Sequence, residues 1–149
     1  MVPCAILAAG VAAFQPDCLA DTKVGISTSA YLRAHTTAID AETVLISLGV
    51  NDGETDHATA DRLAGLRLQI TARRVFWILP ARPEAVRQVI RDIAHAFGDR
   101  LIDTRGYTAS DGLHLSSQTY RTIATIFDVF GRRSQDAPAQ RGRDEATKR

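Results

Sequence analysis

An aspartate and a histidine are spaced for acid–base chemistry in the segment Asp111-Gly112-Leu113-His114. An Asp three residues before a His, with a Gly between them to permit a tight turn, can place its carboxylate on the Nδ1–H of the imidazole. Nε2 then faces outward, so the pair forms a general base with its orienting partner. The same residues also fit an ordinary Asp-Gly turn that carries a surface histidine.

A second polar segment, Gly49-Val50-Asn51-Asp52-Gly53, follows the most apolar run of the chain. Here Gly49 would let the backbone approach a ligand, and the Asn51 side-chain amide would donate a hydrogen bond into a cleft. Asn-Asp-Gly is also a strong turn sequence, which tolerates left-handed backbone conformations and caps the following helix. Taken alone, this segment favours the turn.

Short apolar runs alternate with helix-period segments and must position these two motifs. The runs are Cys4–Leu7, Val24–Ile26, Thr43–Leu48, Val75–Leu79 and Arg100–Ile102. Continuous Val, Ile and Leu runs are typical of parallel strands covered on both faces by helices. Helices are expected at Asp56–Ile70, Pro83–Phe97 with Gly98 as its stop, and Ser117–Phe130, and in two shorter segments, Ala8–Phe14 and Ser29–Ala34.

This alternation predicts an α/β protein, a three-layer α/β/α sandwich with a flavodoxin-like parallel sheet of about five strands. In open parallel sheets, ligands bind outside the carboxyl ends of the strands. Gly49 directly follows the third run, and the Asp111–His114 segment directly precedes the final helix. We therefore expect both motifs at the carboxyl edge of the sheet.

Together, GxND after the third strand and DGxH before the last helix resemble the SGNH hydrolases, also called the GDSL esterase/lipase family. The resemblance covers nearly all of residues 4–130 and implies the SGNH-hydrolase fold. It also implies a Ser-His-Asp mechanism on acyl or acetyl esters, by serine acylation and then hydrolysis by water. Matched by position, His114 is the general base and Asp111 its orienting partner. The oxyanion hole is matched by Asn51, by Gly25 in VGIST, and by Gly49.

The family's nucleophile is missing from this sequence. The resemblance places a Gly-Asp-Ser stretch after the first strand, with the Ser at the start of the first helix. Here Leu7 is followed by Ala8-Ala9-Gly10, so an ungapped alignment leaves no hydroxyl between Leu7 and Gly10. If a tetrapeptide such as Gly-Asp-Ser-Ile has been lost after Leu7, Ala8-Ala9-Gly10-Val11 falls on the helix that follows the nucleophile. We prefer this gapped alignment.

Ser27, Thr28 and Ser29 are candidate replacements for the lost serine, because they follow the second apolar run. A replacement oxygen must approach the histidine Nε2 within roughly 2.6–3.2 Å and also lie beside the oxyanion donors. Helix capping by one of these hydroxyls is the favoured interpretation. Two functions stay open: an ester hydrolase scaffold without its serine, and a non-catalytic ligand-binding pseudoenzyme of the same fold.

Composition and net charge limit the classes of partner that the chain is expected to bind. The chain has 149 residues with 18 Lys+Arg and 17 Asp+Glu, a formal charge of +1. Nucleic acid is not expected, because counterion release needs a basic face. The hydrophobic fraction of 45% excludes a disordered chain, and no apolar run reaches the roughly 20 residues of a membrane span. The expected partner is a small acyl or acetyl ester or an acylated glycan.

No cofactor or metal is expected. The sequence contains no GxGxxG or P-loop pattern, so nucleotide binding has no support. An acidic cluster at Asp52, Glu54, Asp56 and His57 lacks the Gly and the distal Glu of a calcium loop. We interpret this cluster as a solvated helix start. Neither the identity of the substrate nor the oligomeric state can be predicted from these patterns.

We expect one hydrolase-like domain over residues 1–130 and a flexible basic tail over residues 131–149. The tail contains no Leu, Ile, Val or aromatic residue, so it cannot offset its ordering entropy by burial. The apolar start, Val2–Phe14, has no positive residue before it and no small-x-small cleavage pattern close behind. A cytoplasmic location is slightly favoured, and export stays open.

Cys4 and Cys18 lack the spacing of a metal site. We expect buried free thiols, with Cys4 in the first strand and Cys18 at the far side of the first helix. Pairing of the two stays open in an oxidising compartment.

Overall fold

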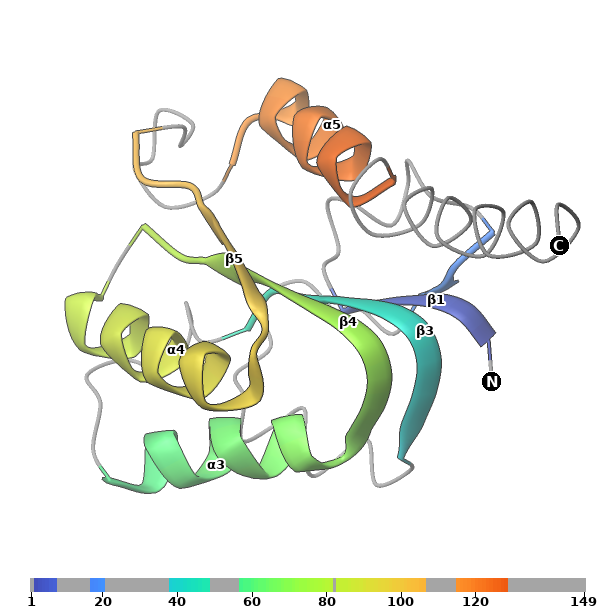
Figure 1. Cartoon of the computed structure of the whole chain (residues 1–149). Helices are drawn as coiled ribbons and strands as arrows, with labels where there is room; N and C mark the ends of the chain where they lie inside the picture. Colours follow the sequence, from blue (N-terminus) through green and yellow to red (C-terminus); the bar gives the residue numbers. More distant parts are fainter. Residues whose placement is uncertain are drawn as a thin grey trace, which may run out of the picture.

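Five strands form one sheet in which every neighbouring pair is parallel (Figure 1). The computed structural model describes residues 2–7, 17–20, 38–48, 57–81, 83–106 and 115–128. The strands are β1 (Val2–Leu7), β2 (Leu19–Ala20), β3 (Ile39–Ile46), β4 (Ile70–Leu79) and β5 (Arg100–Asp103). Their order is β2-β1-β3-β4-β5. This is the order of the flavodoxin-like doubly wound sheet, which confirms the predicted α/β fold.

Helices cover both faces of this sheet. α3 (His57–Leu68) and α4 (Glu84–Phe97) lie on one face, and α5 (Ser117–Ile126) lies on the other (Figure 1). The connections from β3 to β4 and from β4 to β5 step in the same direction across the sheet, so right-handed crossovers place α3 and α4 on one face. The predicted three-layer sandwich is confirmed.

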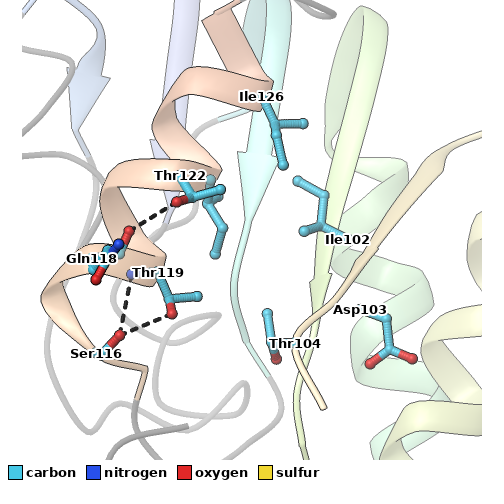
Figure 2. Close-up of a pocket in the computed structure, with 9 residues that line it drawn as sticks. Ile102, Asp103, Thr104, Ser116, Gln118, Thr119, Thr122 and Ile126 are labelled. Atoms are coloured by element: carbon cyan, nitrogen blue, oxygen red, sulfur yellow. Dashed lines mark hydrogen bonds between the residues drawn. The ribbon is translucent and has the colours of Figure 1, made fainter. Parts of the chain in front are cut away.

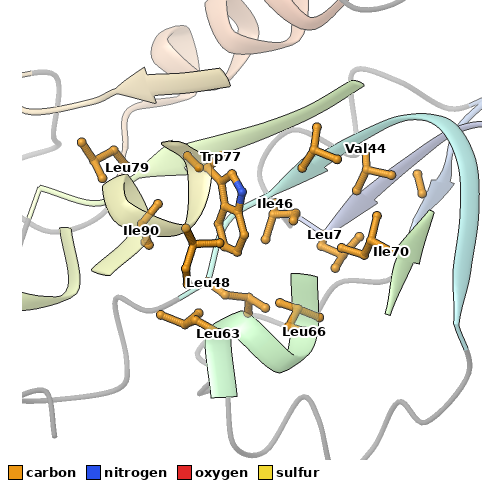
Figure 3. Close-up of a cluster of buried hydrophobic side chains, with 14 of the residues drawn as sticks. Leu7, Val44, Ile46, Leu48, Leu63, Leu66, Ile70, Trp77, Leu79 and Ile90 are labelled. Carbon is orange, nitrogen blue, oxygen red and sulfur yellow. The ribbon is translucent and has the colours of Figure 1, made fainter. Parts of the chain in front are cut away.

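A hydrophobic core lies on each side of the sheet. The core under α3 and α4 surrounds the fully buried Trp77 (Figure 3) and includes Leu7, Val44, Ile46, Leu48, Leu63, Leu66, Ile70, Leu79 and Ile90. The core under α5 consists of Cys4, Ile6, Cys18, Leu45, Phe76, Ile78, Ile123, Ala124 and Phe127. Successive residues of the central strands point alternately into the two cores. This is why the apolar runs are continuous in the sequence.

Capping residues fix the helix limits. α4 begins after Pro83 and ends at Gly98, whose φ of 71° is a left-handed conformation that glycine adopts at little cost. Gly98 is the predicted stop. α5 begins after Ser116, whose hydroxyl accepts a hydrogen bond from the Thr119 N–H at 3.2 Å. The described part of this helix ends before Phe130, the predicted last residue, which lies outside the described residues.

Two details of the predicted elements are wrong. Ile70, predicted as the end of a helix, is the first residue of β4, because it pairs with Ile39 in the sheet. Phe97 falls on the apolar stripe of the predicted helix, with Val86 and Ile90, where burial is expected, but it is 41% exposed at the end of α4. The guanidinium of Arg67 lies over its ring instead, 4.5 Å from the ring centroid.

The edge of the sheet beyond β1 is formed by β2, Leu19–Ala20. The strand predicted at Val24–Ile26 and the short helices predicted at Ala8–Phe14 and Ser29–Ala34 lie outside the described residues. β2 was not predicted. Its two residues are too few to produce a recognisable apolar run, and both are exposed.

Cys4 and Cys18 form a disulfide bond, with their Cα atoms 4.9 Å apart. The expectation of free thiols is therefore wrong. Cys4 lies in the first strand, as predicted, while the first helix, to whose far side Cys18 was assigned, lies outside the described residues. Parallel pairing of β1 with β2 sets Ala5 opposite Leu19, which brings the preceding residues of the two strands together. This pairing could not be read from the spacing of the two cysteines in the sequence.

Candidate functional site

The direction of winding reverses at β1, because β2 lies on one side of this strand and β3, β4 and β5 lie on the other. The resulting switch point lies between β1 and β3. The Ser47 N–H donates a hydrogen bond to the Leu7 carbonyl oxygen at 3.0 Å there. The last residue of β1 and the residues that lead to Gly49 therefore lie side by side. In doubly wound folds, ligands bind in the crevice at this point.

The predicted site residues lie outside the described residues: His114, Asp111, Asn51, Gly25 and Gly49. The same holds for the positions between Leu7 and Gly10, where the nucleophile is expected, and for the candidate replacements Ser27, Thr28 and Ser29. The geometry of the catalytic groups thus stays a prediction. The described residues place the strand and helix ends that flank them.

Asp111 and His114 lie in residues 107–114, and the described residues on either side of this range are held by contacts with the rest of the fold. On one side, Thr104 is 2% exposed, and its Oγ1 donates a hydrogen bond to the Leu79 carbonyl oxygen at 2.8 Å. On the other side, Leu115 packs against the core under α5. Thr104 and Ser116 line one pocket, so the described residues that flank this range lie near each other.

A buried arginine joins the ends of β4 and β5. The Arg87 side chain is 1% exposed. Its guanidinium donates to the carbonyl oxygen of Pro80, directly after β4, at 2.7 Å. Two further N–H groups donate to the two carboxylate oxygens of Asp103, the last residue of β5, at 3.0 Å each. This arrangement holds the ends of two neighbouring strands in register at the candidate site.

The Arg87 guanidinium keeps Asp103 ionised. Its hydrogen bonds lower the pKa of the Asp103 carboxyl to about 2, against the opposing effect of burial, and the Arg105 backbone N–H adds a hydrogen bond at 3.0 Å. Glu84 lies on the other side of Arg87, 3.4 Å from its Nε, and its own pKa is lowered chiefly by a hydrogen bond from the Arg105 side chain. Asp103 is therefore a fixed anion at neutral pH and no proton donor.

Sequence reasoning did not single out Arg87, Asp103 or Thr104. A signal for Arg87 was present: it lies on the same helical stripe as Ile90 and Ala94, at spacings of three and seven residues, and all three are buried. A charged residue on an apolar stripe requires a buried or half-buried partner. Asp103, the last residue of β5, is this partner.

A pocket of about 480 Å³ lies between β5 and α5 (Figure 2). It is lined by Ile102, Asp103, Thr104, Ser116, Gln118, Thr119, Thr122, Ile123 and Ile126. Its volume falls within the range of roughly 300–1,000 Å³ that is usual for small-molecule sites.

Within the described ranges, no three or more His, Cys, Asp or Glu side chains gather into a group that could hold a metal ion. The helices of that same part of the chain all fall short of the length and apolarity that a bilayer span requires.

Comparison with solved structures finds a weak likeness. No family model matches the chain, and no curated protein sequence matches it. A solved structure described as "a putative arylesterase from Agrobacterium tumefaciens str. C58" is similar at a TM-score of 0.49 and 15% sequence identity, over 84% of this chain and 97% of that chain. The strand order and the helices on both faces of the sheet establish the fold without this likeness.

Proposed function

We propose that the chain is an SGNH-type hydrolase scaffold that binds acyl or acetyl esters and lacks the family's nucleophilic serine. One observation carries the proposal. The Ser47 N–H to Leu7 carbonyl hydrogen bond sets the exit of β1 beside the exit of β3, at the switch point of a β2-β1-β3-β4-β5 sheet. In the sequence, the GxND motif begins two residues after Ser47.

The proposed roles follow the order of the chemistry. His114 acts as general base through Nε2, and Asp111 holds the imidazole by accepting a hydrogen bond from Nδ1–H. Asn51, Gly25 and Gly49 donate hydrogen bonds to the oxyanion that forms as the ester carbonyl becomes tetrahedral. The contacts that hold Thr104 and Leu115, on either side of residues 107–114, support this scheme, because a base must be held in place to act.

Because no serine lies between Leu7 and Gly10, we expect this chain to hydrolyse esters slowly. Loss of the nucleophile from a triad costs several orders of magnitude in turnover, and the oxyanion hole with an oriented water leaves a residual rate. The same absence supports a second function, a pseudoenzyme that binds an acylated small molecule or glycan without cleaving it.

Restoring the tetrapeptide separates these functions. The chain with Gly-Asp-Ser-Ile inserted after Leu7 is compared with a control that carries Gly-Asp-Ala-Ile at the same place, using a short-chain chromogenic ester. We expect the serine insertion to hydrolyse the ester and the alanine insertion to match the parent chain. His114→Ala in the serine insertion should remove the gain.

Two results would count against the hydrolase scaffold. One is a serine insertion that folds, as judged by circular dichroism and a cooperative unfolding transition, and yet shows no esterase activity. The other is activity that persists unchanged after His114→Ala. Binding of an acylated glycan by the parent chain, with an inactive serine insertion, would favour the pseudoenzyme. The domain limits, residues 1–130 with a tail over 131–149, are part of the proposal and predict that removal of the tail leaves these results unchanged.

A further inference from the structure

The hydroxyl groups on the wall of the pocket between β5 and α5 are already paired within the protein. Thr104 Oγ1 donates to the carbonyl at the end of β4 at 2.8 Å. Thr122 Oγ1 donates to the backbone carbonyl one helical turn earlier at 3.0 Å. Ser116 Oγ and Thr119 Oγ1 lie 2.9 Å apart and share a hydrogen bond. With their hydroxyls held in this way, the threonines contribute their methyl groups to the wall.

Isoleucines complete this wall. Ile102 from β5 and Ile126 from α5 extend toward each other across the pocket (Figure 2), and Ile123 is buried beside them. Asp103, the one ionised side chain among the described residues that line the pocket, turns toward α4, where Arg87 pairs with its charge. Side chains alternate along a strand, so Ile102 and Thr104 face α5 while Asp103 faces the opposite layer.

We infer that this pocket binds an uncharged alkyl chain of a small ligand, the acyl or alkoxy arm of an ester. An alkyl chain gains affinity by burial against methyl groups and needs no hydrogen-bond partner. A polar or charged group would instead lose its hydration at a wall whose described hydroxyl groups are already engaged.

The position of the pocket ties this chain-binding site to the proposed chemistry. Thr104 and Ser116 line the pocket, and they flank the two ends of the stretch that carries Asp111 and His114. A chain bound here lies beside the anchors of that stretch. The assignment of the alkyl chain to an ester rests on the proposed function, whereas the binding of the chain itself rests on the pocket alone.

α5 offers a matched pair of variants. Thr122 and Thr125 are both exposed, and each donates its hydroxyl to the backbone carbonyl one turn earlier, at 3.0 and 3.1 Å. Of the two, only Thr122 lines the pocket. Thr122→Trp should fill the pocket, while Thr125→Trp should place the same side chain elsewhere on the helix at the same cost to helix propensity.

The test measures binding to the parent chain and needs no turnover. Methyl butyrate, hexanoate and octanoate extend the acyl arm, and butyl, hexyl and octyl acetate extend the alkoxy arm. Each ester is titrated while backbone and methyl NMR shifts are followed. The expected affinity rises by about fourfold per buried methylene in at least one series, with shifts at Ile102, Thr119 and Thr122. The series that shows the rise identifies the arm that the pocket takes.

In Thr122→Trp we expect binding of the hexyl or hexanoyl ester to weaken by about 16-fold, the loss of roughly two buried methylenes, with little change in Thr125→Trp. Melting temperatures of both variants check that the fold is retained. Affinity that does not depend on chain length, shifts that fall elsewhere, or equal effects of the two tryptophans would overturn the inference. Esterase activity of the serine insertion without alkyl binding would contradict the role of the pocket and leave the proposed function standing. Alkyl binding in the pocket without esterase activity of the serine insertion would contradict the proposed function and leave the role of the pocket standing.

Discussion

Removal of the Asp103 carboxylate should destabilise the fold more than removal of the Arg87 guanidinium that it binds. The two side chains differ in burial, since the arginine side chain is 1% exposed and the aspartate side chain is 49% exposed. Asp103→Ala leaves a buried cation with the Pro80 carbonyl as its remaining hydrogen-bond acceptor and Glu84 3.4 Å from its Nε. Arg87→Met leaves a carboxylate that water can reach.

The expected magnitudes follow from this asymmetry. Breaking a buried ion pair at one partner costs about 3–5 kcal/mol, and access of water at the half-exposed Asp103 reduces this to about 2–3 kcal/mol for Asp103→Ala. Arg87→Met keeps most of the buried volume and leaves one carbonyl unpaired, at a cost of about 1 kcal/mol. The double variant should resemble Arg87→Met alone, because the buried charge is then gone.

Urea unfolding of the parent, the two single variants and the double variant at neutral pH measures all four free energies of unfolding. An interaction energy of about 2–3 kcal/mol, equal to the cost of Asp103→Ala, is expected between the two positions. Additive effects, or a larger loss for Arg87→Met than for Asp103→Ala, would refute the assignment of Arg87 as a buried cation that depends on Asp103.

The pH dependence gives an independent check. The pKa of Asp103 is lowered from 3.8 to about 2 in the folded chain. Because the pKa of Asp103 is lower in the folded chain than in the unfolded chain, its ion pair with Arg87 stabilises the fold fully at pH values above the unfolded pKa. This stabilisation is lost as the pH falls through the folded pKa. The cost of Asp103→Asn should therefore shrink as pH is lowered from about 4 toward 2. In Arg87→Met, NMR titration should find the Asp103 pKa moved back toward its ordinary value.

Three further predictions concern other parts of the chain. Replacing Cys4 and Cys18 by alanine should lower the free energy of unfolding by about 3 kcal/mol, because their bond closes a loop with a sequence separation of 14 residues. Equal urea midpoints of the parent with and without reductant would contradict this. Trp77→Phe should lower the free energy of unfolding by about 1–3 kcal/mol, because the Trp77 Nε1–H donates to the nearly buried Asp99 carboxylate at 3.0 Å. A lowered urea midpoint of this variant is the expected measurement. In the serine insertion, Asn51→Ala should raise the barrier by about 2.7–4 kcal/mol with little loss of stability, whereas a stability loss with an unchanged rate would make Asn51 a turn residue.

The central strands and the main helices could be predicted because each of their residues has a burial requirement that the sequence reveals. Val44, Leu45 and Ile46 face alternate cores, so their run is uninterrupted and indicates a strand covered on both faces. Gly98 ends α4 because a left-handed residue is needed there, and the sequence supplies glycine. These features depend on residues that are close together in the sequence, so the sequence alone could predict them.

Features that depend on contacts between distant segments could not be predicted. The Cys4–Cys18 bond requires β2 to lie beside β1, and β2 is two residues long with no apolar pattern. The contact between Arg87 and Asp103 joins a helix to the end of the following strand, 16 residues later. The pocket between β5 and α5 depends on how far the helix stands from the strand, which composition does not encode.

The described end of β1 also bears on the missing serine. A lost tetrapeptide predicts that the first strand either ends early or enters its helix without the turn that presents a serine. β1 does not end early: Leu7 pairs with Ile46, and its carbonyl accepts the Ser47 N–H at 3.0 Å. The pairing of the two strands therefore continues without a break from Cys4 to Leu7, the last residue before the candidate insertion point. Residues inserted after Leu7 add to the chain beyond the ladder and remove none of its hydrogen bonds, so the serine insertion is expected to keep the sheet intact. The insertion thus tests the chemistry at the switch point and not the stability of the sheet.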